Sequence, residues 1–155
     1  MSSTRSAAGP SNSKVRLRYG RSVKIKRFNR VELLIEEKDI EAAVAKFNDL
    51  FGFHLPSPDP VPGQKVRSST DYDAQIEFFA PHGEGSPLER RLQEKGRGAI
   101  GPLVWEVDDI EEAKQWAISK GINIVFEFTS ERGTRQIHFD PDQFFGYGVT
   151  LTQLA

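Results

Sequence analysis

The chain has 155 residues, of which 37% are hydrophobic and 10% aromatic, enough for one compact domain with a core. It contains no cysteine, which excludes a disulfide framework and thiolate catalysis and fits a reducing compartment. The net charge is only −1, but nine of the 21 basic residues and none of the acidic residues lie within residues 1–30. We therefore expect a basic arm, residues 1–26, before an acidic domain.

The basic arm has two possible roles. It could contact nucleic acid or anionic lipid, or it could be a flexible tail that lies on the acidic body; we favour the tail, because aromatic residues are few and no binding motif is present. Residues 1–13 are expected to be disordered. Residues 15–26 alternate basic and apolar side chains and could form an edge strand or reach a partner subunit. No apolar run has the length of a membrane span or signal peptide, so we expect a cytoplasmic protein without membrane or nucleic-acid partners.

A short internal repeat organises the rest of the chain. The tripeptide Asp-Ile-Glu at residues 39–41 recurs 70 positions later at residues 109–111, and Gly52 precedes Gly121 by 69 positions. Each copy follows a strand-like run, residues 31–35 or 103–107, and begins an amphipathic helix. The repeat predicts two copies of one unit, too few for a solenoid.

Further strands follow each predicted helix. In the first copy a proline-rich loop, residues 56–62, leads to strands at 65–69 and 74–79. In the second copy we expect strands at 122–128, 135–139 and 149–154. A helix over residues 87–95, opened by Pro87, and a glycine-rich joint connect the copies. The predicted domain, residues 27–155, thus contains two β-α-β-β-β modules, at about 28–81 and 100–154.

The order of these elements, with the phrases QIEFFAP at residues 75–81 and FDP at residues 139–141, resembles the vicinal oxygen chelate superfamily. This superfamily includes glyoxalase I, bleomycin-resistance proteins and extradiol dioxygenases, and the likeness is greatest to methylmalonyl-CoA epimerase. The resemblance covers about residues 28–154. It implies an α+β fold in which two tandem βαβββ modules form one cup-shaped sheet.

The resemblance also implies a divalent metal held by four side chains, from the first and last strand of each module. In this chain those positions fall on Arg30 or Glu32, on Glu77, on Pro102 and on Thr152. Arginine and proline cannot ligate a metal, and threonine is a poor ligand. We therefore expect no resident metal or other cofactor, the alternative being a hard cation held by Glu32, Glu77 and water.

Strand alternation predicts which side chains face the inside of the cup. They are Arg30, Glu32, Gln75, Glu77, Glu106, Thr150 and Thr152. Neighbouring carboxylates raise one another's pKa, so Glu77, and second Glu32, are candidates for proton transfer. Arg30 could hold a carboxylate or thioester oxygen. The alternative is a solvated sheet face with ion pairs such as Arg30 with Glu32.

Other candidates lie in the second module. His138 could be a general base, or simply a packed or surface histidine. Substrate binding is expected from Arg30, Gln75, Glu106, Arg135, Tyr147, Thr150 and Thr152. Phe144 and Phe145 could form a lid or a subunit contact, or pack in the core.

Three functions are compatible with these residues. The first is a metal-independent isomerase, epimerase or lyase that transfers a proton on a small acyl or carbonyl compound. The second is a protein of the bleomycin-resistance kind that sequesters a small molecule, and the third is an interaction protein that uses the arm. We favour the enzyme and expect a homodimer.

Overall fold

The computed structural model describes residues 22–155. Most of the expected basic arm, residues 1–21, lies outside this range, and with it the expectation of disorder in residues 1–13. The first strand, β1, begins at Ile25 and lies in the middle of the sheet. Ile25 and Lys26 therefore belong to a central strand and not to the edge strand that the alternating pattern allowed.

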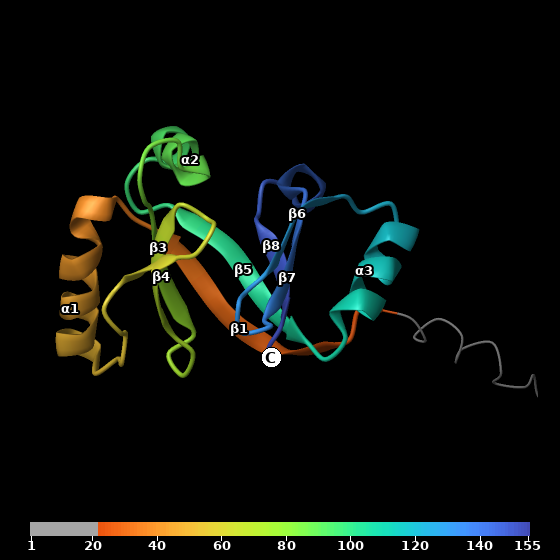
Figure 1. Ribbon diagram of the computed structural model, residues 1–155. Coiled ribbons are helices and arrows are strands. Elements are labelled where there is room, and N and C mark those ends of the chain that lie inside the picture. Colours follow the sequence, from red (N-terminus) through yellow and green to blue (C-terminus); the bar gives the residue numbers. More distant parts are fainter. Residues whose placement is uncertain (1–21) are drawn as a thin grey trace, which may run out of the picture.

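The described chain forms an α+β domain (Figure 1). The elements of the first half are β1 (Ile25–Leu34), η2 (Glu37–Asp39), α1 (Ile40–Phe51), β2 (Asp59–Val61), β3 (Val66–Asp71) and β4 (Ile76–Pro81). A connecting helix, α2 (Pro87–Lys95), follows. The second half contains β5 (Ile100–Val107), α3 (Ile110–Ser119), β6 (Ile124–Thr129), β7 (Arg135–Phe139), η3 (Pro141–Phe144) and β8 (Val149–Gln153). The predicted βαβββ order is confirmed in both halves.

The eight strands form one sheet in the order β2-β3-β4-β1-β5-β8-β7-β6. In each half the first strand pairs in parallel with the last, β1 with β4 and β5 with β8. The two first strands, β1 and β5, pair antiparallel and join the halves. This twofold symmetry of the strand order is what the Asp-Ile-Glu repeat predicted.

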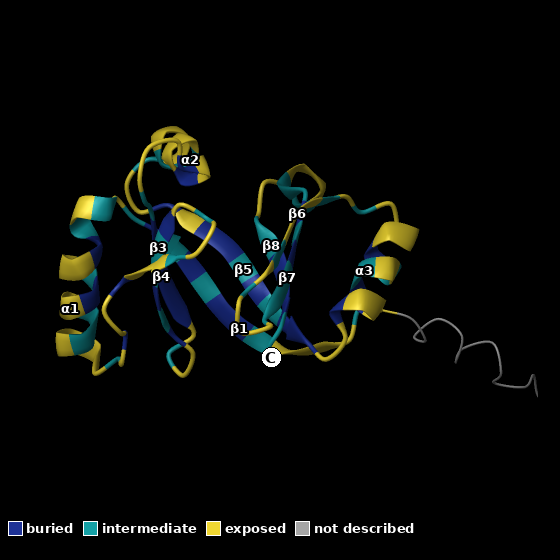
Figure 2. Ribbon diagram, in the orientation of Figure 1, coloured by how far each residue is buried: buried dark blue, intermediate teal, exposed yellow. Residues whose placement is uncertain are grey.

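Each module buries one helix against the outer face of its half-sheet. Ile40 of α1 and Ile110 of α3 occupy equivalent places and are 0% and 1% exposed. Ile40 packs with Phe78 and Ala80, and Ile110 packs with Ile137 and Leu151. Full burial of each isoleucine contributes about 1.5–3 kcal/mol. Figure 2 shows these buried segments on the sides of the helices that face the sheet.

We call the opposite side of the sheet, away from α1 and α3, the cup face. Helix α2 covers part of it: Leu88 and Leu92 pack on Leu34 and Phe79. The helix begins as predicted, because Pro87 occupies the first turn and the Ser86 hydroxyl accepts a hydrogen bond from the Leu88 amide. No helix within residues 22–155 has the length and apolar character needed to cross a membrane.

Candidate active site

The centre of the cup face holds a buried arginine between two buried carboxylates. Glu32 of β1 lies directly opposite Glu77 of β4 in the parallel register, and Arg30 lies two residues before Glu32 on the same side of β1. Arg30 Nε donates to Glu77 Oε2 at 2.5 Å, and Nη2 donates to Glu32 Oε1 at 2.8 Å. Strand alternation therefore predicted this triad correctly.

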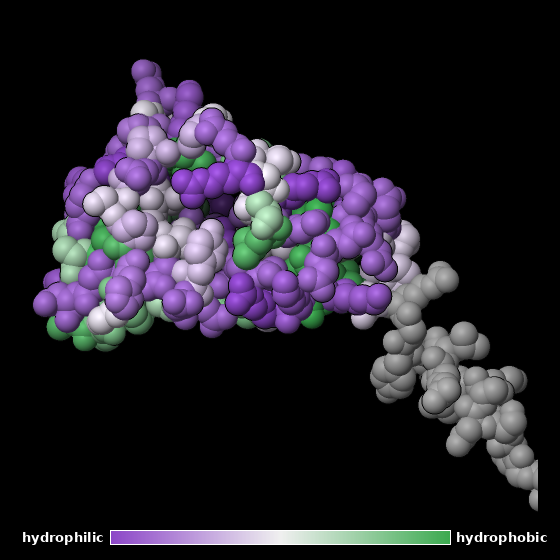
Figure 3. Space-filling view, turned by 60° about the horizontal axis from the view of Figure 1, so that its bottom comes forward, coloured by the Kyte–Doolittle hydropathy of each residue, from purple (hydrophilic) through white to green (hydrophobic). Residues whose placement is uncertain are grey.

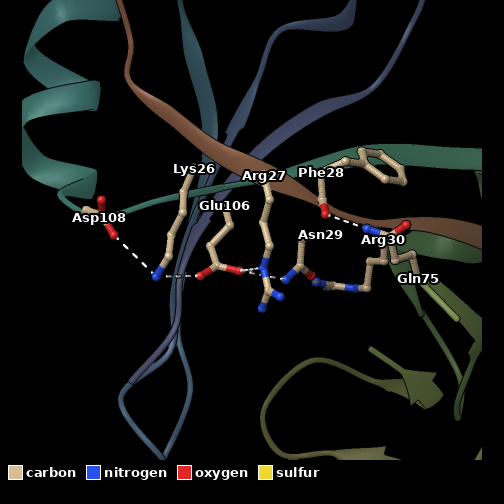
Figure 4. Close-up of polar contacts among 8 residues, drawn as sticks. All are labelled: Lys26, Arg27, Phe28, Asn29, Arg30, Gln75, Glu106 and Asp108. Atoms are coloured by element: carbon tan, nitrogen blue, oxygen red, sulfur yellow. Dashed lines mark hydrogen bonds and ion pairs between the residues drawn. The ribbon is translucent and has the colours of Figure 1, made fainter. Parts of the chain in front are cut away.

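An irregularity in β1 adds Asn29 to the triad. The pairing of β1 with β5 shifts between Phe28 and Arg30, so the consecutive residues Asn29 and Arg30 are both buried. Arg30 Nη1 donates to Asn29 Oδ1 at 2.7 Å, and Asn29 Nδ2 donates to Glu106 Oε2 at 3.4 Å (Figure 4). Strict alternation places Asn29 on the other face, which is why the sequence pattern missed it.

Glu106 lies at the far end of this chain of polar contacts. Arg27 Nε contacts Glu106 Oε2 at 2.6 Å, and Lys26 Nζ contacts its other oxygen at 3.2 Å and Asp108 at 3.3 Å (Figure 4). These hydrogen bonds lower the pKa of Glu106, although burial opposes them. Both Glu106 oxygens are thus held by cations at the start of β1.

The contacts within the triad shift the pKa values of Glu32 and Arg30. Burial first, and then the neighbouring Glu77, raise the pKa of Glu32 to about 8, against the opposing charge of Arg30. Burial acts to lower the pKa of Arg30, but the charges of Glu77 and Glu32 outweigh it and raise that pKa. Glu32, the second candidate for proton transfer in the sequence analysis, therefore holds a proton more readily than a solvated glutamate, and Arg30 stays charged.

A second, neutral wall of the site comes from the second module. The register aligns Arg30, Val104, Thr150 and His138 in one row across β1, β5, β8 and β7. His138 Nδ1 and Thr150 Oγ1 form a hydrogen bond of 2.9 Å. Burial, followed by the positive charges of Arg30 and Arg91, lowers the pKa of His138 to about 4, so the imidazole is neutral.

Thr150 and Thr152 lie where the alternation predicted. Both are fully buried in β8 on the same side as each other. Thr152 Oγ1 donates to the Arg135 carbonyl at 3.3 Å, so this hydroxyl contacts backbone. Of the two threonines, Thr150 is the one that joins the row containing His138.

Three predicted substrate-binding residues lie elsewhere. Gln75 has a left-handed backbone (φ 57°) before β4, which interrupts the alternation; its side chain is exposed and donates to the Phe28 carbonyl at 2.8 Å (Figure 4). Arg135 pairs with Glu111 of α3 at 2.8 Å, on the outer face of the sheet together with Ile137. Tyr147 is 68% exposed in the loop before β8. Arg135, expected to bind substrate at the border of the cup, thus lies on the outer face, and the Gln75 side chain is bonded to a backbone carbonyl.

Two residues near the triad were not predicted. Tyr72, in the turn between β3 and β4, has its ring centroid 6.0 Å from Arg30 Cζ. Arg91 of α2 is half-buried, and its positive charge acts to lower the pKa of both Glu32 and His138. Neither belongs to the strands that the alternation argument covered. The face seen in Figure 3 has a recess near the middle of the molecule, bordered by hydrophilic residues on one side and by neutral and hydrophobic residues on the others.

The residues at the implied metal positions do not fit a divalent cation. The Arg30 guanidinium bridges Glu32 and Glu77, so a positive group already lies between the two carboxylates. Pro102 offers no side-chain ligand, and the Thr152 hydroxyl is used by a backbone carbonyl. Within residues 22–155, histidine, cysteine, aspartate and glutamate form no group of three that could hold a metal ion. The donor set is that of an internal ion pair and not of a metal centre.

Comparison with known proteins supports the same fold. Residues 33–139 match the family model of the glyoxalase/bleomycin resistance protein/dioxygenase superfamily. A curated relative is the ethylmalonyl-CoA/methylmalonyl-CoA epimerase of Cereibacter sphaeroides, 29% identical over 135 residues that cover 84% of this chain and 99% of the relative.

Solved structures of two methylmalonyl-CoA epimerases are also similar. The Mycobacterium tuberculosis enzyme has a TM-score of 0.75 and 20% identity, over 87% of this chain and 92% of that chain. A variant of the Streptomyces coelicolor enzyme in complex with 2-nitronate-propionyl-CoA has a TM-score of 0.72 and 18% identity, over 85% of this chain and 99% of that one. The matched family model, together with the paired βαβββ modules, shows that this chain belongs to the glyoxalase/bleomycin resistance protein/dioxygenase superfamily.

Proposed function

We propose that this protein is an acyl-CoA epimerase that moves a proton at the carbon next to a thioester carbonyl. The observation that carries the proposal is the buried Arg30 held between Glu32 and Glu77, because it combines a fixed cation with two adjacent carboxyl groups, and burial raises the pKa of one of them, Glu32. The epimerase relative from Cereibacter sphaeroides, aligned over most of both chains, supports the choice of an acyl-CoA substrate.

The triad supplies the groups that such a reaction needs. In the proposed step Glu77 takes the proton from the α-carbon, and the electron pair of the broken C–H bond moves onto the thioester oxygen to give an enolate. Arg30 stabilises the negative charge that develops there, in a site from which water is largely excluded. Because Arg30 is held by two hydrogen-bonded carboxyls, it needs little reorganisation during the reaction.

Inversion requires a proton donor on the opposite side of the enolate. His138 lies on the other wall of the cup, in the row that contains Arg30. When Thr150 Oγ1 donates to His138 Nδ1, the neutral imidazole carries its proton on Nε2. As that proton passes to the α-carbon, Nε2 takes one from water, and Glu77 gives its proton to the hydroxide that remains. This proton exchange with solvent returns Glu77 and His138 to their starting protonation states. The reverse reaction uses the same residues in the opposite order.

We also propose that the reaction needs no metal, because Arg30 supplies positive charge between the carboxylates. The test is deuterium exchange into methylmalonyl-CoA and ethylmalonyl-CoA in heavy water, with protein first treated with EDTA. We expect exchange to persist after chelation, and Glu77→Gln to lower its rate by about 100-fold or more. Glu94→Gln, in an exposed pair on α2, is the control and should retain full activity.

Each alternative has a distinct outcome. Tight binding of these esters with no exchange in the wild-type protein would indicate sequestration, as in bleomycin-resistance proteins. Exchange that stops with EDTA and returns with a divalent metal would contradict the metal-independent mechanism. Full activity in Glu77→Gln, with wild-type circular dichroism, would exclude Glu77 as the base.

A further inference from the structure

Helix α2 places one arginine toward the cup face. Leu88 and Leu92 pack on Leu34 and Phe79, which fixes the side of α2 that faces the sheet. Arg91 follows Leu88 by three positions and so lies along the same side. It is half-buried, whereas the adjacent Arg90 is exposed and pairs with Glu94 at 2.7 Å. Two neighbouring arginines on one helix thus have opposite environments.

The position of Arg91 lets it act on both walls of the site. Its positive charge acts to lower the pKa of Glu32 on β1 and of His138 on β7, which belong to different modules. Leu34 and Phe79, on which α2 packs, each follow one of the two carboxyl residues by two positions and so lie on the same face of the sheet. The side of α2 that carries Arg91 is therefore next to the carboxyl pair, where a bound ligand could reach it.

The charge balance of the site sets Arg91 apart from Arg30. Arg30 is bonded to Glu77, Glu32 and Asn29, so its donors are largely used. Arg91 forms no ion pair within residues 22–155. An uncompensated, partly desolvated guanidinium favours an anionic partner, and its planar donors match a carboxylate or a phosphate.

Resting on the proposed function, we propose that Arg91 binds the free carboxylate of the acyl group and so selects acyl-CoA esters that carry a carboxylate on the α-carbon. Arg30 remains opposite the thioester oxygen. The two arginines thus have different roles. Arg30 stabilises the enolate, and Arg91 orients the acyl group so that its α-carbon lies between Glu77 and His138. The sequence-based expectation named Arg30, and not Arg91, as the residue that could hold a carboxylate.

The test compares two CoA esters that differ in the carboxylate. Binding of methylmalonyl-CoA and propionyl-CoA is measured by isothermal titration calorimetry for the wild-type protein, Arg91→Met, Arg91→Lys and the control Arg90→Met. We expect Arg91→Met to weaken methylmalonyl-CoA binding by about 10–100-fold and to leave propionyl-CoA unchanged. Arg91→Lys should recover part of the loss, and Arg90→Met should match the wild type. In exchange assays KM should rise more than kcat falls.

The outcomes separate this inference from the proposed function. An equal loss for both esters would show that Arg91 contacts a phosphate of the CoA moiety, and no loss for either would show that it contacts no anion; both overturn the inference while exchange activity stands. Arg91-dependent binding of methylmalonyl-CoA without any exchange would support the inference and overturn the epimerase. If the wild-type protein binds neither ester, both are overturned. Thermal unfolding of Arg91→Met checks that the variant is folded.

Discussion

The two modules carry different side chains on the cup face of their strands. Arg30, Glu32 and Glu77 form buried ion pairs on β1 and β4, whereas Thr150 and His138 lie on β8 and β7, where the half-buried imidazole is neutral. Yet the two modules share strand order, parallel pairing of first and last strands, and a buried isoleucine at the start of the helix. The comparison shows that the duplicated sequence pattern determines the strand order and the core of each module. The side chains on the cup face do not take part in that core, so they can differ between the modules.

The largest expected effect comes from removing the charge of the first module. Arg30→Met would leave two buried carboxyl groups beside each other without their cation. We expect a loss of about 3–5 kcal/mol in the free energy of unfolding, measured by urea denaturation. The control is Arg135→Met in the second module, whose ion pair with Glu111 is about half exposed and should contribute less than about 1 kcal/mol. Similar stability losses in the two variants would contradict the asymmetry.

A second pair of variants tests the symmetry of the cores. Ile40→Ala and Ile110→Ala remove equivalent, fully buried side chains, so each should cost about 2–5 kcal/mol. The two losses should agree within about 1 kcal/mol if the modules pack alike. Urea denaturation of both proteins under one set of conditions provides the measurement. A small loss in only one of them would show that its module relaxes around the cavity.

The pH dependence of stability should have opposite signs in the two modules. The pKa of Glu32 is raised to about 8 in the folded protein, so its contribution to stability is complete below about pH 4.5 and is lost as the pH rises through 8. The pKa of His138 is lowered to about 4, so its contribution is present above about pH 6.5 and is lost as the pH falls through 4.

Unfolding free energies of Glu32→Gln and His138→Gln between about pH 4 and pH 9 measure these contributions. Relative to the wild type, Glu32→Gln should gain roughly 1–3 kcal/mol between about pH 5 and pH 8.5, and His138→Gln should gain a similar amount between about pH 7 and pH 4. If the unfolding free energies of all three proteins depend on pH in the same way, neither Glu32 nor His138 changes its pKa on folding.

The smallest expected effect concerns the starts of the two helices. The Asp109 carboxylate accepts a hydrogen bond from the Glu112 amide at 2.9 Å, whereas the Asp39 side chain forms no capping hydrogen bond. The difference arises because the 3₁₀ turn η2 leads into α1, so Asp39 already has helical backbone angles. Asp109→Ala should cost about 1 kcal/mol and Asp39→Ala close to nothing. Thermal unfolding compares the two, and equal losses would contradict this account.

Much of the site was predictable because strands alternate regularly. Alternation alone places Arg30, Glu32 and Glu77 on one face of the sheet, and it places Thr150 and Thr152 correctly. It fails where the backbone departs from a regular strand: at Asn29, where the pairing with β5 shifts, and at Gln75, whose left-handed backbone interrupts the alternation.

Arg91 shows a different limit. The sequence predicts the helix over residues 87–95 and its first residue, but the helix has polar residues on most sides. Which arginine faces the cup depends on how Leu88 and Leu92 dock on Phe79, a contact between distant parts of the chain. The same holds for Glu106: its partner Lys26 belongs to the segment that composition alone suggested was an arm, and its partner Arg27 follows that segment directly.

By itself the sequence determined the two-module architecture, the helices and most of the residues that share the cup face, since these follow from local periodicity and from the repeat. Only the tertiary structure decided that the pKa of Glu32 is raised, that Arg30 is ion-paired and that Arg91 forms no ion pair among residues 22–155. Those properties depend on burial and on distances between charges, and both are set when strands and helices that are far apart in the chain come into contact.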